Sequence, residues 1–530
     1  MISLCFDVRR YYSAIFCFNM RYSFSIILLL FLPFCIFAKT ISPLDIGLKQ
    51  AKNGEERFRV LYQTHALAKK NHWDVSYKGI KELSIEIPSD AKSIPLGNVT
   101  DFKGVILTVT NTKKKNFFLF ELSQELHPIS VPKTLLDTYD FGSVKELNQG
   151  NKILVIKDDN PWVENRAGHD YGATRKDILF LKNGKALNKT IATYDNASSR
   201  PSCSFAEVTK EQKIISNITF KRTKESKCKT FFVRVQNMDN VLLQGIRIIT
   251  PTPVEMTADT AITINNCTNV FFKHVAFHQT YSLSNKSGYG IYMNNVWNSW
   301  FDDIVSEAAW GIFGNNNIHN AHLSNCRINR FDTHCYGKDV YFNNCIITKI
   351  GLPQSSFLGE LVFSRCTFQK AHVCVARTDY NAFTPFKIIL NDCEIYLDKQ
   401  HTCLINLGNI DAKTNSRKEL NKKYSPSLSV VNSKIYLTDG LTNWSVYRIG
   451  GDSGNSPFDF IGDIAVDGLT VEGNSSTLQV FNRRIKSRRS ASIDIKKVGL
   501  MRSDKNIKAL KQKKILHSPT IVTNIEGSSF

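Results

Sequence analysis

The sequence has no pair of cysteines spaced as Cys-x-x-Cys, although it contains 13 cysteines in 530 residues. This absence argues against zinc ribbons and thioredoxin-like redox motifs. Acidic residues are scarce relative to basic ones, because 47 Asp and Glu stand against 68 Lys and Arg, which gives a net charge of +21. A charge of this size favours an anionic partner, namely nucleic acid, an anionic membrane or an acidic polysaccharide.

The sequence also lacks an apolar run of the roughly 20 residues that a membrane-spanning helix needs. Its most apolar stretch, FSIILLLFLPFCIFA, covers residues 24–38 and follows Arg21. This pattern predicts a signal peptide over residues 1–38, with a membrane anchor as the alternative and either Met1 or Met20 as the start. We therefore expect a secreted or periplasmic protein with no stable membrane span after cleavage, and an extracellular polyanion rather than nucleic acid as the partner.

Helical periodicity is nearly confined to one segment, EERFRVLYQTHALAKK at residues 55–70, which predicts an N-terminal helical cap within residues 39–82. Short strands rich in β-branched and aromatic residues follow, bounded by Asn, Gly or Ser. They include LSIEIP (83–88), GVILTVTN (104–111), NKILVIK (151–157), SNITFKR (216–222), NVLLQGIRII (240–249), AITINNCTNVFFKHVAF (261–277) and VYFNNCIITKI (340–350). The fold class is therefore all-β.

A tripeptide of two polar residues and a cysteine recurs after these strands. Its copies end at Cys267, Cys326, Cys345, Cys366 and Cys393, with spacings of 59, 19, 21 and 27 residues, and Asn294-Asn295-Val296 divides the first gap. A period of roughly 20 to 30 residues indicates a solenoid, in which stacked coils share one core. A β-sandwich is the alternative.

We expect the asparagines of this repeat to lie at turns in the left-handed conformation, with hydrogen bonds between equivalent side chains. The cysteines are expected to form a buried column inside the coils rather than disulfides or metal ligands. A disulfide between Cys203 and Cys228 remains open.

With this repeat, the chain from about Leu83 to Leu500 resembles a right-handed parallel β-helix of the pectin-lyase-like superfamily. The stretch Arg330-Phe331-Asp332-Thr333-His334, followed by Asn343-Asn344-Cys345 and Arg377-Thr378-Asp379-Tyr380, is similar to a pattern in phage-associated and bacterial β-helix proteins that act on polysaccharides. Asn381 replaces the usual Gly and Phe383 the expected Trp. The resemblance implies a β-helix over residues 83–500 with loop insertions that include 112–210, and a basic C-terminal cap or tail over 501–530.

Five polar residues alternate along one predicted strand and are expected to share an exposed face. They are Arg330, Asp332, His334, Tyr336 and Lys338. Arg377, Asp379 and Tyr380 follow two coils later and are expected to lie within about 10 Å, because coils stack about 4.8 Å apart. A purely structural ladder of ion pairs is the alternative.

These residue types match the needs of β-elimination on a uronate-containing glycan. The resemblance, which extends to secreted bacterial lyases of glycosaminoglycans, implies a glycosaminoglycan such as chondroitin sulfate, dermatan sulfate or hyaluronan as that glycan. Arg330 and Arg377 would neutralise the substrate carboxylate, and His334 would remove the proton at C5. Tyr380 or Tyr336 would protonate the leaving oxygen, and Asp332 would orient His334 or Arg330. Lys338 and Asp379 are predicted substrate contacts.

A second group of aromatic and basic residues lies upstream, in PWVENRAGHDYGATRKD. It predicts a loop in which a sugar ring stacks on Trp162 while Arg166 and Arg175 hold carboxylate or sulfate, with His169 as a further contact or base. A polar loop held by its own hydrogen bonds is the alternative.

Two other functions remain open: a glycoside hydrolase that uses Asp332 and Asp379, and a glycan-binding β-helix without catalysis. No cofactor is predicted, and calcium is left open. The segment 483–514 carries thirteen basic residues and is expected to form a cap over the last coil or to attract the glycan. We expect a monomer.

Overall fold

The computed structural model describes most of the chain from Lys39 onward. Outside the described residues lie 1–38, 115–116, 164–171, 192–193, 195–198, 223–229, 250–258, 279–287, 307–310, 352, 355–356, 377–385, 408–423, 451–459, 474–479, 483–490, 502–520 and 527–530. The predicted signal peptide and most of the predicted basic segment 483–514 therefore fall outside the description. In the part that is described, no helix is both long and apolar enough to cross a membrane.

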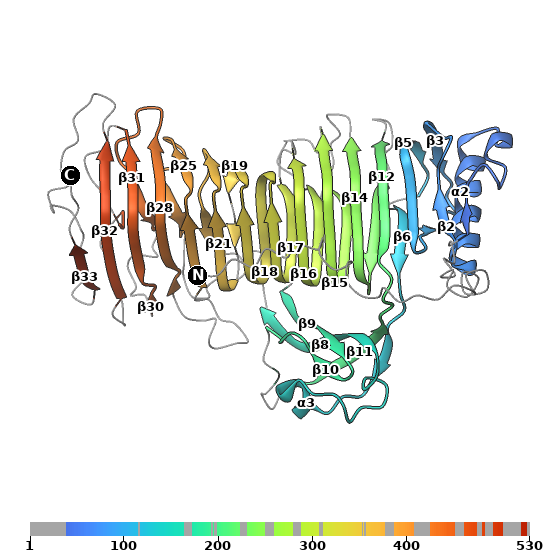
Figure 1. Ribbon diagram of the computed structural model, residues 1–530, viewed down its shortest axis with the longest axis horizontal. Coiled ribbons are helices and arrows are strands. Elements are labelled where there is room, and N and C mark those ends of the chain that lie inside the picture. Colours follow the sequence, from blue (N-terminus) through green and yellow to red (C-terminus); the bar gives the residue numbers. More distant parts are fainter. Residues whose placement is uncertain are drawn as a thin grey trace, which may run out of the picture. The chain divides into compact units, whose positions relative to one another are not determined.

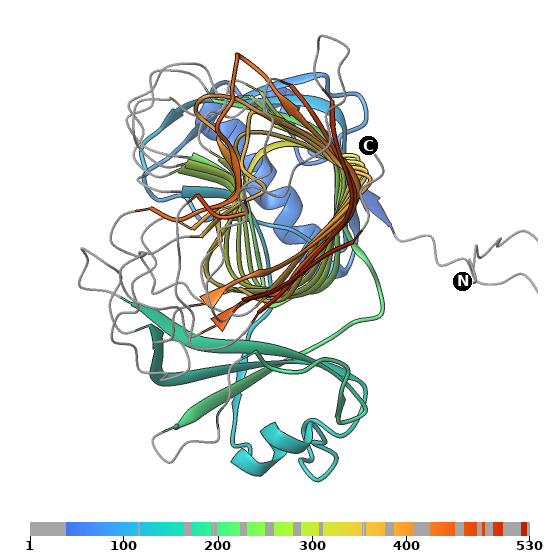
Figure 2. The same ribbon diagram turned by 90° about the vertical axis from the view of Figure 1, so that its left-hand side faces the viewer.

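Parallel strands form most of the described structure, and 26 of them join in one sheet. Figure 1 shows them side by side from the cap helix to the last strand, and Figure 2, along the axis, shows the coils around a common interior. Their bounds are β1 Thr40–Ile41, β2 Asp74–Ser76, β3 Glu82–Ile87, β4 Ile94–Pro95, β5 Val99–Thr112, β6 Phe117–Ser123, β12 Lys213–Arg222, β13 Thr230–Gln236, β14 Asp239–Ile249, β15 Asp259–His278, β16 Gly288–Ser306, β17 Gly311–Ser324, β18 Arg327–Asn343, β19 Ile346–Gly351, β20 Pro353–Gln354, β21 Phe357–Ser364, β22 Thr367–Gln369, β23 Cys374–Ala376, β24 Phe386–Asn391, β25 Glu394–Leu397, β26 Cys403–Asn406, β28 Ser427–Leu437, β29 Ser445–Arg448, β31 Ile464–Glu472, β32 Ala491–Met501 and β33 Ile521–Glu526. The fold is a parallel β-helix, as the repeat predicts.

The recurring asparagines turn the chain at the corners of the coils. The middle residue of each repeated tripeptide has a left-handed φ: 49° for Asn266, 55° for Asn325, 53° for Asn344, 53° for Arg365 and 53° for Asp392. Side-chain amides also bond from coil to coil, as in the column Asn237, Asn266, Asn295 and Asn317, with distances of 3.0, 3.0 and 2.6 Å. The predicted turn geometry and asparagine column are both confirmed.

The cysteine of each tripeptide lies inside the coils. Cys267, Cys326, Cys345, Cys366 and Cys393 are buried free thiols. Burial raises the pKa of the Cys267 thiol to about 12, so this thiol stays protonated and acts as an apolar filler. Cys203 is likewise a buried free thiol, which argues against its disulfide with Cys228, a residue outside the described part.

The helix α2 (Gly54–Asn71) covers the N-terminal end of the solenoid. Its first turn is capped by Asn53, whose side chain accepts a hydrogen bond from the Glu56 amide, and it ends at His72 in the left-handed conformation. Phe58, Leu61 and Ala68 lie on its buried face. The predicted cap is confirmed, although coiling starts earlier than expected, because β1 and β2 already pair in parallel within residues 39–82. A short 3-10 turn, η1 (Leu48–Gln50), precedes α2.

An insertion between β6 and β12 forms a separate antiparallel sheet rather than loops. Its strand order is β10-β9-β8-β11-β7. The elements are β7 His127–Ile129, α3 Lys133–Thr138, β8 Asn151–Val163, β9 Ala173–Lys182, β10 Lys185–Ala186 and β11 Pro201–Glu207. The segment 151–157 is thus a strand, but not one of the solenoid. Figure 1 shows this sheet beside β15 to β18. The small sheet of β27 (Tyr424–Ser425) and β30 (Phe460–Ile461) lies nearer the C-terminus.

Candidate functional site

The upstream aromatic group lies in the core of the insertion. Trp162 is 0% exposed and packs with the apolar residues of β8 and β9. Its ring centroid is 4.2 Å from that of Tyr336, a residue of β18. The prediction that a sugar stacks on Trp162 is therefore wrong, because no face of the indole is open to a ligand.

Arg175 has a structural partner in place of the predicted carboxylate or sulfate. Its guanidinium lies 3.6 Å from the Asp158 carboxylate, and the two side chains are 3% and 0% exposed. Asp158 also accepts a hydrogen bond of 2.5 Å from the Ser199 hydroxyl. The predicted ligand-binding role of Arg175 is wrong, and Arg166 and His169 lie outside the described residues.

Tyr336 joins the insertion to the solenoid. It is 1% exposed and belongs to the same apolar cluster as Trp162. Its hydroxyl donates to the Lys176 carbonyl and accepts from the Lys176 amide at 3.1 Å. Nearby, Asn295 donates to the Asp177 carbonyl at 3.2 Å. The predictions that Tyr336 binds substrate or protonates the leaving oxygen are therefore wrong, because this side chain is walled off from solvent.

The predicted alternation holds only for the first part of β18. Phe331 points into the core, so Arg330 and Asp332 point to the outer wall of the coil. The register then shifts: Thr333 pairs with Asn315 and Cys335 pairs with Asn316. His334 is the extra residue of this bulge, which re-aims its side chain toward the cluster around Asp332.

Four side chains meet at Asp332, and we call them the wall cluster: Arg330, Asp332, His334 and Tyr289 of β16. One oxygen of Asp332 lies 2.5 Å from the Arg330 guanidinium, 2.7 Å from the Tyr289 hydroxyl and 3.2 Å from His334 Nε2. The Tyr289 hydroxyl is also 2.8 Å from His334 Nε2. Arg330, Asp332 and His334 were predicted to act together, and the structure brings them together.

Burial within the wall cluster is graded. The side chain of Asp332 is 0% exposed and that of Arg330 is 8% exposed, whereas that of His334 is 14% exposed. Tyr289 is half-buried. His334 and Tyr289 therefore form the accessible side of the cluster, and the ion pair of Arg330 with Asp332 lies beneath them.

Gly314 of β17 makes room for Tyr289. Gly314 pairs with Asp332 on the next coil. A Cβ atom added at Gly314 would lie 2.5 Å from Cδ2 of the Tyr289 ring. The missing side chain therefore lets the ring lie against the strand and bring its hydroxyl to Asp332.

The chemistry of the wall cluster follows from its proton count. The Tyr289 hydroxyl has one proton and lies 2.7 Å from the Asp332 carboxylate and 2.8 Å from His334 Nε2. Both distances are hydrogen-bond distances, so the arrangement allows a proton to move between Tyr289 and His334. The buried Arg330 balances the charge of Asp332, and this ion pair fixes both partners. Arg330 is therefore committed to Asp332 and does not act as a carboxylate clamp for a substrate, which corrects its predicted role.

Sequence reasoning missed Tyr289. It lies 43 residues before Asp332 and 45 before His334, and two coils of the solenoid separate them in sequence. The only usable signal would have been the coil register, which pairs β16 with β17 and β17 with β18.

The remaining predicted residues are placed as follows. Lys338 is half-buried on the outer wall and makes no ion pair with any described residue. Arg377, Asp379 and Tyr380 lie outside the described residues. Within the described ranges, no group of three or more His, Cys, Asp or Glu is arranged to hold a metal ion.

No protein-family model and no curated protein matches the sequence. Among solved structures, the tailspike protein gp49 of Pseudomonas phage LKA1 is similar, with 12% identity over 86% of this chain and 81% of that one, at a TM-score of 0.54. The tailspike gp61 of Pseudomonas phage phi297 has 11% identity over 87% of this chain and 80% of that one, at a TM-score of 0.49. The tailspike Gp54 of Acinetobacter baumannii bacteriophage AP22 was solved with a capsular saccharide. It has 11% identity over 93% of this chain and 78% of that one, at a TM-score of 0.36. The first of these likenesses supports the β-helix fold.

Proposed function

We propose that this protein is a secreted polysaccharide lyase that cleaves an acidic, uronate-containing glycan by β-elimination. The observation that carries the proposal is the wall cluster, in which a partly exposed His334 and Tyr289 stand 2.8 Å apart over a buried carboxylate. The net charge of +21 favours a polyanionic substrate. The similarity to the tailspike gp49 supports the β-helix fold on which this proposal places the site.

In the proposed reaction, His334 accepts the proton from C5 of the uronate. The bond between C4 and the glycosidic oxygen breaks, a double bond forms between C4 and C5, and the Tyr289 hydroxyl gives its proton to the leaving oxygen. His334 then returns the C5 proton to Tyr289. Asp332 holds both groups in place, and acid–base catalysis of this kind contributes about 10²- to 10⁴-fold in rate.

The substrate carboxylate requires a cation, because its charge must be balanced before C5 becomes acidic enough. Arg330 is committed to Asp332. We assign this task to Arg377 and Lys338, with Asp379 as a further substrate contact. Tyr289 takes the role of proton donor that sequence reasoning gave to Tyr380 or Tyr336.

The hydrolase alternative loses its support at Asp332. A glycosidase needs carboxyl groups that reach the glycosidic bond or its water. The Asp332 side chain is 0% exposed and already contacts Arg330, Tyr289 and His334. A glycan-binding protein without catalysis is the second candidate, and the burial of Arg330 and Asp332 is the observation that favours it, because a buried ion pair also serves structure alone.

The test is incubation with chondroitin, dermatan, hyaluronan, heparin, alginate and pectin, followed by the ultraviolet absorbance of an unsaturated uronate. The lyase predicts a rise in absorbance with at least one of these glycans. New reducing ends without that absorbance would indicate hydrolysis. Binding without either signal would indicate the non-catalytic protein.

A further inference from the structure

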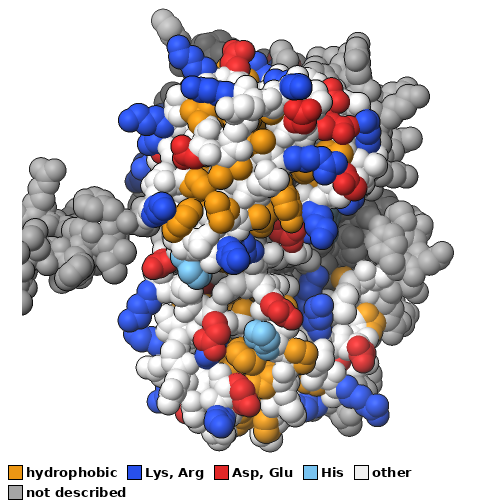
Figure 3. All heavy atoms as spheres, turned by 90° about the vertical axis from the view of Figure 1, so that its right-hand side faces the viewer, with side chains coloured by type: hydrophobic (Ala, Val, Ile, Leu, Met, Phe, Trp, Pro, Cys, Tyr) orange, Lys and Arg blue, Asp and Glu red, His pale blue; other side chains and the backbone are white. Residues whose placement is uncertain are grey.

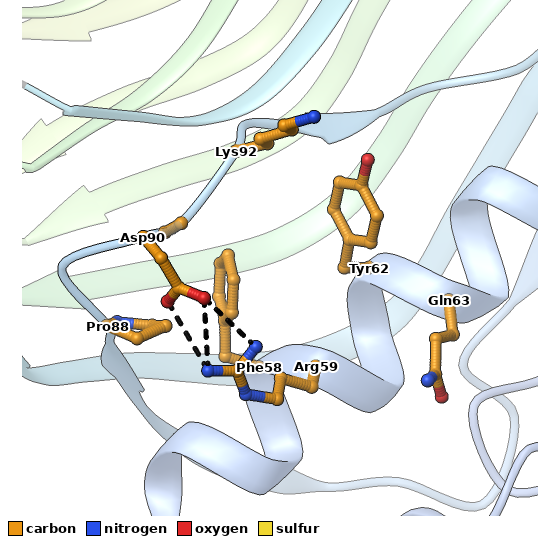
Figure 4. Close-up of a pocket in the computed structure, with 8 residues that line it drawn as sticks. Phe58, Arg59, Tyr62, Gln63, Pro88, Asp90 and Lys92 are labelled. Atoms are coloured by element: carbon orange, nitrogen blue, oxygen red, sulfur yellow. Dashed lines mark hydrogen bonds and ion pairs between the residues drawn. The ribbon is translucent and has the colours of Figure 1, made fainter.

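A cavity of about 340 Å³ opens at the N-terminal cap, far from the wall cluster along the chain. It lies between α2 and the segment that follows β3, as Figure 4 shows. We call it the cap pocket, lined by Phe58, Arg59, Tyr62, Gln63, Pro88, Asp90, Ala91 and Lys92. Its volume falls in the range of small-ligand sites, about 300 to 1,000 Å³.

The helical period brings an aromatic pair to the cap pocket. Phe58 and Tyr62 are four residues apart and therefore lie on one face of α2. Phe58 is 3% exposed and packs on Phe117, with ring centroids 6.2 Å apart. Tyr62 is half-buried, so its ring remains partly open to the cavity. The pocket thus has an apolar floor with one accessible aromatic ring.

The rim of the cap pocket carries more positive than negative charge. Arg59 contacts Asp90 at 3.3 Å through side chains that are 55% and 65% exposed, which is a loose surface pair. Lys92 is exposed and has no ion-pair partner among the described residues. Lys114 adds a third cation beside the pocket, where its ammonium donates to the Ala91 carbonyl at 2.5 Å. The lining of the pocket therefore has two cations and one carboxylate, and Lys114 lies beside it.

Uncommitted hydrogen-bonding groups complete the cap pocket. The Tyr62 hydroxyl and the Gln63 amide bond to no described side chain or backbone group. Figure 4 shows Arg59 reaching toward Asp90, and the Tyr62 ring standing upright with its hydroxyl on the side of Lys92. Figure 3 shows this end of the molecule, with apolar and basic side chains next to one another on its surface. An aromatic face with nearby cations suits a sugar ring that bears a carboxylate.

We propose that the cap pocket is a second glycan-binding site, which holds an acidic sugar residue without acting on it. The Tyr62 ring contacts the apolar face of the sugar, and Lys92 and Arg59 contact its carboxylate. This site shares its ligand class with the proposed function, but its test measures binding alone.

The test uses ligand-observed saturation-transfer NMR and titration with an unsulfated chondroitin tetrasaccharide, an oligogalacturonate and, as a neutral probe, maltotetraose. All proteins carry His334→Ala, so that a cleaved probe does not confuse the readout. We expect an acidic probe to bind more tightly than maltotetraose. Lys92→Glu should weaken its binding at least about tenfold, because an attraction becomes a repulsion. Lys78→Glu is the matched control, because Lys78 is an exposed lysine of the same cap outside the pocket.

Tyr62→Ala removes the aromatic ring and leaves the cations of the pocket in place, so it measures the contribution of the ring alone. It should also weaken binding of the acidic probe about tenfold. A melting curve shows whether the Tyr62→Ala protein is folded. If it is unfolded, the binding measured for the Lys92→Glu protein alone supports or overturns the proposal. Equal binding by the Lys92→Glu and Lys78→Glu proteins, or no binding of either acidic probe, would overturn the cap site. Failure of the lyase proposal would be seen in a different protein, because the parent protein with His334 intact would then show no turnover while the tetrasaccharide still bound the His334→Ala protein.

Discussion

Two contacts between a histidine and an aspartate lie on the outer wall of the same solenoid and differ in almost everything except their residue types. His274 and Asp303 are 2.8 Å apart, with side chains 52% and 49% exposed. His334 and Asp332 are 3.2 Å apart, with side chains 14% and 0% exposed, and they share a tyrosine and an arginine. The first is a solvated surface pair worth about 0 to 1 kcal/mol, whereas the second is a buried network in which each group depends on the others.

The difference shows that residue types alone do not identify a site. Solvent screens the exposed pair, and Asp303 is the one hydrogen-bond partner that the His274 side chain has among the described residues. In the wall cluster, Arg330 holds Asp332 in place, and the same Asp332 oxygen accepts the hydrogen bond of the Tyr289 hydroxyl and lies 3.2 Å from His334 Nε2. The predictions that follow compare the two pairs, beginning with the largest expected effect.

Asp332→Ala should lower the free energy of unfolding by about 3–5 kcal/mol, because it removes the buried carboxylate that balances the Arg330 charge. Asp303→Ala should change it by less than about 0.5 kcal/mol. Urea denaturation of both variants measures the difference. The double variant Arg330→Met/Asp332→Leu should regain most of the stability but no turnover. Equal losses in the two single variants would contradict the distinction between the pairs.

Tyr289→Phe should reduce turnover of an acidic glycan at least about 10²-fold, because it removes the proposed proton donor. Its cost in unfolding free energy should be only about 1 kcal/mol. Tyr292→Phe is the matched control, since Tyr292 lies on the same strand and its hydroxyl bonds to Asn316 rather than to the wall cluster. Steady-state rates for the two variants should therefore differ, and similar rates would remove Tyr289 from the mechanism.

Gly314→Ala should cost about 1–3 kcal/mol of stability and reduce turnover roughly tenfold, because the new methyl group meets the Tyr289 ring. Combining it with Tyr289→Phe should add little further loss of rate, since both act through the same hydroxyl. Fully additive rate losses would show that Gly314 acts elsewhere.

His274→Ala should leave both turnover and melting temperature nearly unchanged, with a stability change within about 0.5 kcal/mol. A substantial loss of activity in this variant would place function on the exposed pair and reverse the comparison.

The solenoid was predictable because its signal is local and repeated. Each copy of the tripeptide carries its own turn residue and its own buried cysteine, as Asn344 and Cys345 do, so the sequence alone marks the corners at these copies. The grouping of Arg330, Asp332 and His334 was predictable for the same reason, since these residues are neighbours on one strand.

The place of Tyr289 in the wall cluster and the burial of Trp162 could not be predicted, because both depend on contacts between segments that are distant in sequence. Tyr289 reaches the wall cluster only through the register of three strands, which no local pattern records. Trp162 and Arg175 have the composition of a sugar-binding loop, but the antiparallel insertion buries both. Aromatic and basic residues serve a core and a binding surface equally well, and only the packing distinguishes the two.

The most direct measurement is the rate at which the His334→Ala and His274→Ala proteins form unsaturated uronate from the glycan that the parent protein cleaves. The account predicts a loss of about 10²- to 10⁴-fold for His334→Ala and the parental rate for His274→Ala, with both proteins folded. A folded His334→Ala protein that works at the parental rate would contradict the assignment of the wall cluster as the active site.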